Sequence, residues 1–193
     1  MKKFELTNEF VTNMFGTKLF RIRALVEFGD VEAGELGGYV EKESNLGHDD
    51  NAWVYGDARV YDNALVYDNA RVYGDAQVSG DARVYDNARV YGDAWVYGDA
   101  WVYGNARVCG DALVCGDARV CGNGDYAYAH GFGSVNRTTT FFRLKDGGVG
   151  VRCGCFYGTL AQFRDKIRET HGETKKAQEY LMLADLMKLR FEK

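Results

Sequence analysis

A six-residue motif repeats twelve times without interruption between residues 51 and 122 and constrains the possible fold strongly. The units read NAWVYG, DARVYD, NALVYD, NARVYG, DAQVSG, DARVYD, NARVYG, DAWVYG, DAWVYG, NARVCG, DALVCG and DARVCG. Each unit places Ala and Val two residues apart, so both side chains lie on one face of a short extended segment, Ala-x-Val-Tyr. Gly, Asn and Asp accept left-handed backbone conformations and therefore mark the turns between units.

The corner residues indicate how many repeats make one coil. Asn recurs every 18 residues, at positions 51, 69, 87, 105 and 123. Three hexapeptides therefore complete one turn of a triangular prism, in which each short strand pairs with its equivalents in neighbouring coils. Four complete coils with a strand spacing of about 4.8 Å give a prism about 20 Å tall. A flat sheet or propeller blades fit less well, because six residues leave too little chain for a strand pair and its loop.

The repeats also carry a resemblance to a known family. Val54 precedes Ala58 by four positions, and every later unit keeps this spacing through Val114 and Ala118. This pattern resembles the hexapeptide-repeat proteins, and the resemblance implies a left-handed parallel β-helix. The flanks, LFRIRALVEFGDVEAGELGGYVEKESNLG and TTTFFRLKDGGVGVRCGCFYGTLAQFRDKIRETHG, are similar to a group of bacterial and phage or prophage proteins. Members of that group are labelled transferases or polymer-forming cytoskeletal proteins, labels that derive from the repeat and say little about activity.

We divide the chain into four segments. Residues 1–50 form an N-terminal cap with two degenerate repeats, which include two extra residues around positions 48 to 50, and residues 51–122 form the β-helix. Residues 123–137 are interpreted as an end cap and linker, and residues 138–193 as a small α+β unit. The predicted fold class is therefore mainly β, with about four to five coils of β-helix followed by a hairpin and two helices.

The C-terminal segment has its own secondary-structure signals. Residues 138–145 and 149–156 alternate like strands around an Asp-Gly-Gly turn. Thr159 is the expected N-cap of a helix that ends near His171, and a second helix follows from about Thr174 to Phe191.

The second predicted helix is apolar on two sides. One stripe consists of Ala177, Tyr180, Leu181, Ala184 and Met187. The other consists of Met182, Leu183, Leu186 and Leu189. Because a helix that is apolar on both sides must be covered on both sides, we expect the second stripe to contact another copy of the chain. This predicts a homo-oligomer, most simply a dimer.

The predicted prism has a narrow core filled by Ala and Val, which leaves no internal cavity for a substrate. Any binding function then lies on the outer faces, at the ends or in the flanks. The candidate partner-binding residues are Trp53, Arg71, Arg89, Arg107, Trp95, Tyr97, Trp101, Tyr103 and Leu113. Trp, Tyr and Arg often anchor protein interfaces. We also expect the face with Trp95, Tyr97, Leu113 and Cys115 to lie under another element or another subunit.

Two structural interpretations of these residues stay open beside the functional one. Stacked tyrosines stabilise neighbouring strands whether or not they bind anything. The arginines of the column Arg71, Arg89 and Arg107 could grip an acidic partner or phosphates, or could neutralise the aspartates at the corners.

Histidines suitable for catalysis are scarce. Hexapeptide-repeat acyltransferases bind an acyl-coenzyme A between subunits and use a histidine as general base, usually on a loop that leaves the helix. The histidines of this chain, His48, His130 and His171, all lie outside the regular repeats. The sequence shows no orienting partner for any of them, so we expect no catalytic residue.

The cysteines do not predict a metal site or a disulfide framework. Cys109, Cys115 and Cys121 fall on three different faces of the prism and cannot converge on one ion. Cys153 and Cys155 share a face of a strand, but one Cys-x-Cys pair is a weak metal signal. We predict free thiols, no metal and no cofactor.

Charge and hydrophobicity narrow the function further. Residues 1–50 and 51–122 each carry a net charge of −4, and residues 123–193 carry +4. This distribution does not favour nucleic-acid binding. The N-terminus has no apolar segment typical of a secretory signal, and no apolar run is long enough to span a bilayer, so we expect a cytoplasmic protein.

The sequence thus predicts a non-catalytic binding or scaffold protein. The phage and prophage resemblance suggests a host protein as partner, reached in the host cytoplasm, and a bacterial defence complex that the protein inhibits is one such target. Two alternatives are kept, a hexapeptide-repeat acyltransferase or its inactive relative, and a protein that sequesters a small nucleotide between subunits.

Overall fold

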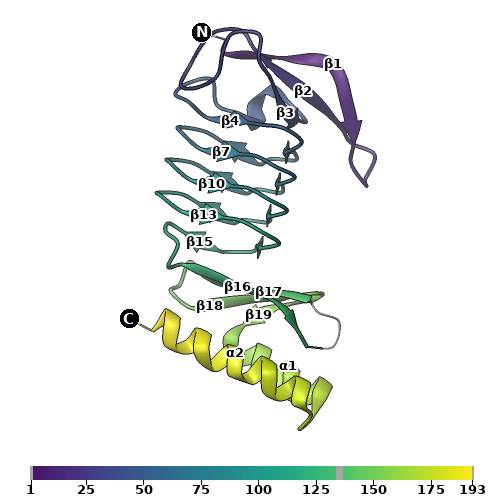
Figure 1. The fold of residues 1–193 in the computed structure, drawn as a ribbon, viewed down its shortest axis with the longest axis vertical. Coiled ribbons are helices and arrows are strands. Elements are labelled where there is room, and N and C mark those ends of the chain that lie inside the picture. The colour runs from purple at the N-terminus through teal and green to yellow at the C-terminus, as the bar shows by residue number, and fades with distance from the viewer. Residues whose placement is uncertain (1, 134–136, 193) are drawn as a thin grey trace.

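The computed structural model describes residues 2–133 and 137–192 and consists of a β-solenoid between two caps (Figure 1). The N-terminal cap contains strands β1 (Phe4–Thr12), β2 (Lys18–Ala24) and β3 (Leu36–Val40) and the 3-10 helix η1 (Glu43–Asn45). The solenoid strands are β4 (Trp53–Val54), β5 (Arg59–Val60), β6 (Leu65–Val66), β7 (Arg71–Val72), β8 (Gln77–Val78), β9 (Arg83–Val84), β10 (Arg89–Val90), β11 (Trp95–Val96), β12 (Trp101–Val102), β13 (Arg107–Val108), β14 (Leu113–Val114) and β15 (Arg119–Val120). The C-terminal unit contains β16 (Tyr126–Phe132), β17 (Arg137–Arg143), β18 (Val149–Cys153), β19 (Phe156–Thr159), α1 (Leu160–His171) and α2 (Lys175–Phe191).

The solenoid has the predicted period of three repeats per coil. Strand β10 pairs in parallel with β7 and β13, which places Arg89 between Arg71 and Arg107. The other two sides of the prism show the same 18-residue register, for example Val78 against Val96. The mainly β fold class is therefore confirmed. The left-handed winding of the coils stays an expectation from the family resemblance.

The strands are two residues long, shorter than the four-residue segments expected from the sequence. In the unit Ala58 to Tyr61, the Arg59 and Tyr61 amides donate to carbonyls of the next coil, at 2.9 and 3.0 Å. The Ala58 amide instead donates to the carbonyl of Tyr55 in the preceding unit, at 3.2 Å, and closes the corner. The alanine therefore belongs to the turn, and regular pairing is left to the two residues after it.

The core matches the sequence prediction closely. All twelve repeat valines and all twelve repeat alanines have no solvent exposure. Their regular spacing leaves the prism interior filled by small side chains, so the solenoid itself offers no cavity that could hold a substrate.

The N-terminal cap extends one side of the solenoid. In the described chain, strands β1, β2, β3, β5, β8, β11 and β14 form one continuous sheet. Val40 pairs with Val60, and Leu46 pairs with Val66, both 20 residues apart instead of 18. These registers identify the two degenerate repeats and the two extra residues of the sequence interpretation. The β1–β2 hairpin projects beyond the outline of the coils (Figure 1).

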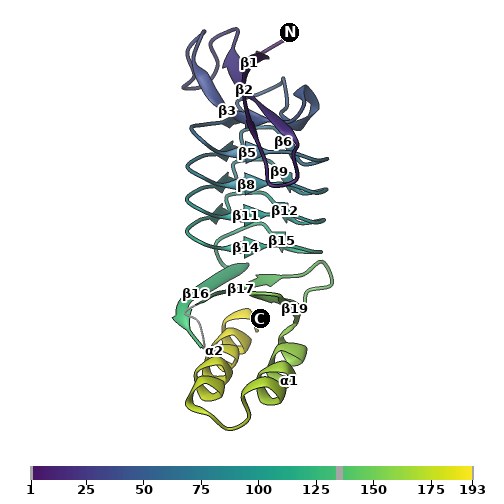
Figure 2. The same ribbon diagram turned by 90° about the vertical axis from the view of Figure 1, so that its right-hand side faces the viewer.

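The C-terminal unit closes the other end. Strands β16, β17, β18 and β19 form an antiparallel sheet below the last coil, and α1 and α2 lie on the sheet face away from the solenoid (Figure 2). Of the interpretation of residues 123–137 as an end cap and linker, the linker part is wrong for β16, because β16 pairs with β17. Residues 134–136 of that predicted linker lie outside the described residues. Within the described part of the chain, no helix is long and apolar enough to cross a membrane.

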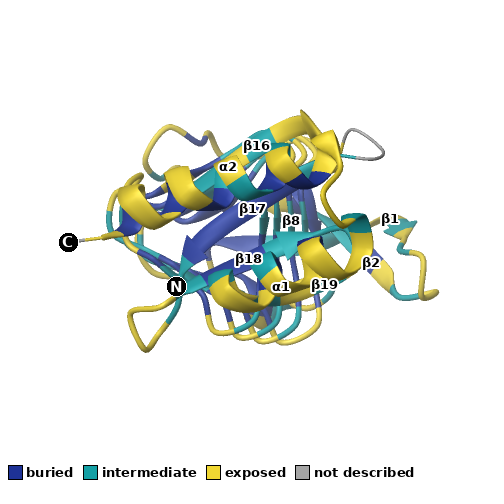
Figure 3. Cartoon of the chain, turned by 90° about the horizontal axis from the view of Figure 1, so that it is seen from below, coloured by how far each residue is buried: buried dark blue, intermediate teal, exposed yellow. Residues whose placement is uncertain are grey.

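The two helices have the expected boundaries because their caps are formed. Thr159 accepts a hydrogen bond from the Gln162 amide at 3.3 Å, and the Gln162 side chain accepts one from the Thr159 amide. Thr174 caps α2 in the same way through the Ala177 amide. Both helices bury their inner faces and expose their outer faces when viewed along the rod (Figure 3).

Candidate functional site

The solenoid presents three outer faces, each named here by one strand. The β7 face consists of β4, β7, β10 and β13, the β8 face of β5, β8, β11 and β14, and the β9 face of β6, β9, β12 and β15. The structure brings the predicted candidates together by column, as the 18-residue spacing required. It also shows that the three faces differ in what covers them.

The β7 face carries a column of arginines with unequal environments. Arg71 forms an ion pair of 2.7 Å with Asp30 of the N-terminal cap. Arg89 and Arg107 are exposed, and among the described residues neither side chain has an ion pair or a hydrogen bond. The corner aspartates therefore do not neutralise this column through direct ion pairs. Tyr73 and Tyr91 stack beside it with ring centroids 4.8 Å apart.

The β9 face combines a tyrosine stack with an Arg-Trp-Arg cluster. Tyr85 stacks on Tyr67 and on Tyr103, at 5.0 and 5.2 Å. The guanidinium groups of Arg83 and Arg119 lie 5.1 and 4.2 Å from the Trp101 ring. Trp101 and Tyr103 are partly buried, and these contacts give both residues a structural role.

The C-terminal unit of the same chain contacts the last coils of the β8 face. The Leu113 amide donates to Thr140 Oγ1 of β17 at 2.9 Å, and Cys115 is buried. The Arg152 guanidinium lies 6.0 Å from the Tyr97 ring centre. Burial raises the pKa of the Tyr97 phenol above its ordinary value. Of the four residues expected under another element, Cys115 is buried, whereas Trp95, Tyr97 and Leu113 keep intermediate exposure.

This cover changes the role of three candidates. Leu113 and Tyr97 contact the C-terminal sheet and so anchor a unit of their own chain. Trp95 lies beside Tyr97, with ring centroids 5.6 Å apart, and its indole nitrogen is buried without a hydrogen-bond acceptor among the described residues. All three side chains are partly buried by these contacts.

The prediction that Trp53 lies on the surface and binds a partner is wrong. Its side chain has no solvent exposure and packs against Phe4 and Phe28 of the N-terminal cap, at 6.2 and 5.3 Å between ring centroids. The hexapeptide register places this residue on an outer position, but the first coil is the one that the cap covers. The sequence signal for this was the cluster of aromatic residues upstream of the repeats.

The oligomer candidates on α2 separate into two groups. Met182, Leu186 and Leu189 are 71%, 55% and 71% exposed. Leu183 is partly buried against the core of the C-terminal unit, so its prediction as part of the exposed stripe is wrong. We call Met182, Leu186 and Leu189 the α2 stripe below.

Two of the histidines have defined neighbours near the ends of the solenoid. His48 stacks on Phe4 at 4.5 Å and accepts a hydrogen bond from the Lys3 amide, and burial lowers the pKa of its imidazole. His130 is exposed, with its Nδ1 atom 2.8 Å from Thr138 Oγ1 and 3.7 Å from an Asp111 carboxylate oxygen. The sequence did not reveal this pairing, because Asp111 and His130 meet only through the β16–β17 hairpin.

Metal ligation receives no geometric support. Among residues 2–133 and 137–192, no group of three or more His, Cys, Asp or Glu side chains could hold a metal ion. The five cysteines are free thiols.

The comparison with protein families concerns the solenoid. Overlapping segments of residues 52–116 match the YdcK beta solenoid repeat, at 52–68, 58–74, 64–80, 76–88, 82–98, 88–104 and 100–116. This chain is a β-solenoid repeat protein. The match spans roughly a third of its length and includes neither cap, and it carries no transferase or cytoskeletal description. No curated protein matches the chain.

Proposed function

We propose that this β-solenoid is a non-catalytic binding protein whose β7 face holds an acidic region of a protein partner. The observation that carries the proposal is the pair of exposed guanidinium groups on Arg89 and Arg107, which lack ion pairs within the described chain. Arginine recognises carboxylates through two parallel hydrogen bonds, a geometry that lysine cannot supply.

The scaffold beneath these groups supports the same proposal. Arg89 and Arg107 each precede a buried core valine in paired strands, so stacked coils hold the backbone at both positions. Tyr73 and Tyr91 stack in parallel planes next to the column and add a flat aromatic surface. A preorganised surface of this kind loses little conformational entropy when it binds.

The surroundings of the arginines favour the β7 face over the β9 face. Arg107 follows the uncharged corner Gly104-Asn105, and Arg89 follows the corner Asp86-Asn87. On the β9 face, Arg83 follows Asp81, and Arg119 already donates to backbone carbonyls at 2.8 Å. Arg83 and Arg119 also lie against the Trp101 ring, so the β7 arginines are the ones without such contacts among the described residues.

The partner class follows from the phage and prophage resemblance of the flanks. A host protein in the cytoplasm, with a defence complex as a specific case, is the proposed target. The proposal makes the chain an inhibitor or adaptor that acts by occupying an acidic surface.

The test is capture of partners from host lysate with immobilised full-length protein. We expect the double variant Arg89→Glu/Arg107→Glu to capture at least tenfold less partner than the wild type, because its glutamates then face the acidic groups of the partner. Arg168→Glu/Lys176→Glu is the matched control, since it reverses two exposed charges on the helices. Equal capture by both double variants and the wild-type protein would contradict the role of the β7 face.

A second candidate function rests on His130. Its position beside Asp111 and Thr138 supplies the orienting partners that a general base requires, which keeps an acyltransferase or an inactive relative in consideration. An acyl-coenzyme A should raise the melting temperature of such an enzyme. We expect no shift, in agreement with a binding protein.

The α2 stripe provides the proposed contact between copies of the chain. Three large apolar side chains on one side of a helix are exposed in the monomer, and a twofold contact would bury them against each other. The resulting dimer would carry two β7 faces, which strengthens binding to a partner that has repeated sites.

A further inference from the structure

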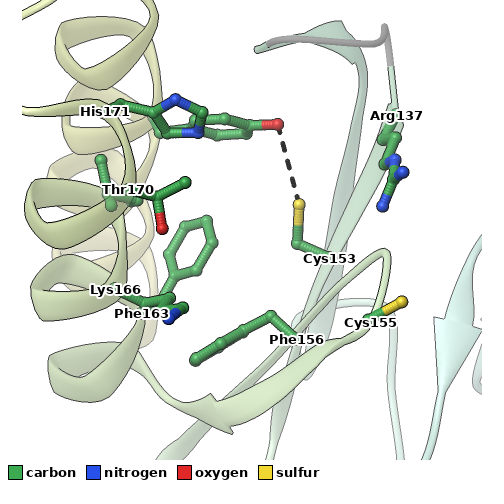
Figure 4. Close-up of a pocket in the computed structure, with 10 residues that line it drawn as sticks. Arg137, Cys153, Cys155, Phe156, Phe163, Lys166, Thr170 and His171 are labelled. Atoms are coloured by element: carbon green, nitrogen blue, oxygen red, sulfur yellow. Dashed lines mark hydrogen bonds between the residues drawn. The ribbon is translucent and has the colours of Figure 1, made fainter.

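The C-terminal unit contains a cavity of about 330 Å³ between the β17–β19 sheet and the two helices. Figure 4 shows side chains from both layers facing this hollow, with Phe156 and Phe163 on one side and Arg137 across from the helices. The cavity lies on the far side of the sheet from the solenoid, away from the β7 face.

Four of its ten lining residues carry aromatic rings. Phe163 lies 5.4 Å from Phe156 and 5.8 Å from Tyr180, measured between ring centroids. The His171 ring stacks on Tyr180 at 5.9 Å and extends the aromatic wall toward the opening. A wall of flat, mutually packed rings is complementary to a flat apolar group.

The polar groups inside the cavity already have partners in the protein. Cys153 Sγ accepts a hydrogen bond from Thr139 Oγ1 at 3.2 Å and lies 3.8 Å from the Tyr180 hydroxyl. The Tyr180 hydroxyl also donates to the Phe132 carbonyl at 3.3 Å. These groups therefore create little demand for a polar ligand atom deep in the cavity.

At the opening of the cavity, in contrast to its interior, a charged side chain lacks an ion-pair partner in the described part of the chain. Lys166 pairs with Glu169 at 2.9 Å, whereas Arg137 has no ion pair in the described part of the chain. No Asp or Glu is among the residues that line the cavity. Gly154 has a positive φ of 56°, and a Cβ atom at this position would collide with the Arg137 guanidinium. The glycine thus leaves room for a cation at the edge of an apolar cavity.

We propose that this cavity binds a small aromatic carboxylate, with the ring against Phe156, Phe163 and Tyr180 and the carboxylate on Arg137. Its volume is at the lower end of ligand pockets, about 300 to 1,000 Å³, which suits a ligand of one or two fused rings. The guanidinium supplies a charge-assisted hydrogen bond at the opening, and the rings supply the buried contact area. This site does not depend on the proposed solenoid function.

The test uses 2-naphthoate as the probe and neutral 2-naphthylmethanol as its uncharged analogue. Isothermal titration of the full-length protein should show saturable binding of naphthoate at least tenfold tighter than binding of the alcohol. Arg137→Gln should remove this difference while binding of the alcohol stays the same. Arg168→Gln is the matched control, because it removes an exposed arginine on α1 that does not line the cavity.

A blocking variant locates the site. Thr170→Trp places a large side chain at the lining from an exposed position, so the fold should persist, as checked by circular dichroism, while naphthoate binding is lost. Absence of saturable naphthoate binding, equal affinity for acid and alcohol, or full binding by Arg137→Gln would overturn the proposal. Full binding by a folded Thr170→Trp variant would overturn the assigned location.

Discussion

At the scale of single residues, the corner geometry explains why the last residue of each repeat is either Gly or Asp. Asp86 has a positive φ of 56°, and its carboxylate accepts a hydrogen bond from the Gly104 amide of the next coil at 3.0 Å. Asp62 does the same for the Gly80 amide at 3.1 Å. An aspartate therefore replaces glycine where its side chain can satisfy a backbone donor in the adjacent coil.

Gly98→Ala should lower the free energy of unfolding by roughly 2 kcal/mol, because a side chain is strained at positive φ. The φ of Gly98 is 68°, and a Cβ atom would lie 3.0 Å from the Gly116 backbone nitrogen, which cannot move aside. Gly122→Ala is the control, because nothing lies within 4 Å of the added methyl group. Urea unfolding followed by circular dichroism measures both, and equal midpoints would contradict the prediction.

Lys3 predicts a specific pH dependence of stability. Burial lowers the pKa of its ammonium group from 10.5 to about 8, although the group donates to the Ala52 carbonyl at 2.9 Å. Between about pH 8 and 10.5 the unfolded chain then binds more protons than the folded chain, so the stability contributed by this site rises with pH. The full change is about 3 kcal/mol.

The measurement compares wild-type protein with Lys3→Met at pH 7.5 and pH 10. Tyrosines that titrate at high pH are common to both proteins, so the difference in unfolding free energy isolates Lys3. We expect the free energy of unfolding of the wild type to rise relative to that of Lys3→Met as the pH rises. A difference that does not change with pH would show that Lys3 is charged in the folded protein throughout.

At the scale of elements, the two caps use outer positions of the solenoid as their packing surfaces. The N-terminal cap covers Trp53 with Phe4 and Phe28, and the C-terminal sheet covers Leu113 and Cys115 through β17. The terminal coils would otherwise expose apolar ends, which explains why a repeat protein needs caps of different sequence.

The burial of Trp53 leads to a direct comparison between two tryptophans. Trp53→Ala should reduce the free energy of unfolding by about 3 to 5 kcal/mol, because it leaves a cavity beneath the cap. Trp101→Ala should have an effect of about 1 to 2 kcal/mol, since this ring is half-exposed and loses mainly its contacts with two arginines. Denaturant titration provides both values, and equal losses would disprove the burial argument.

At the scale of the whole molecule, the two proposed contact surfaces lie on different parts of a rod. The proposed β7 face runs along the solenoid, whereas helix α2, which carries the α2 stripe, lies at the C-terminal end (Figure 1). Partner binding by the β7 face and self-association through the α2 stripe can therefore be tested separately, because the charge changes on the solenoid leave the residues of α2 unchanged.

The oligomer prediction is tested by light scattering at tens of micromolar protein. We expect the wild-type chain to be a dimer and Met182→Lys/Leu186→Lys to be a folded monomer, because two buried charges would face each other in the contact. Ser44→Lys/Ala161→Lys adds two lysines at other exposed positions and should remain a dimer. A monodisperse wild-type monomer would remove the proposal.

The sequence by itself determined the solenoid, because coil-to-coil contacts repeat and are written into a period of 18 residues. The buried Val and Ala columns, the arginine column and the ends of both helices all follow from local pattern and capping. Strand length was overestimated for the same local reason, since the pattern does not reveal that the Ala amide closes the corner.

Only the tertiary structure decided which outward residues are free. Trp53 and Trp101 occupy equivalent repeat positions, yet a cap buries the first and leaves the second half-exposed. The pairing of Asp111 with His130 and the cavity beside Arg137 likewise depend on how the non-repetitive flanks pack. Such contacts join distant segments once each, so no periodicity in the sequence records them.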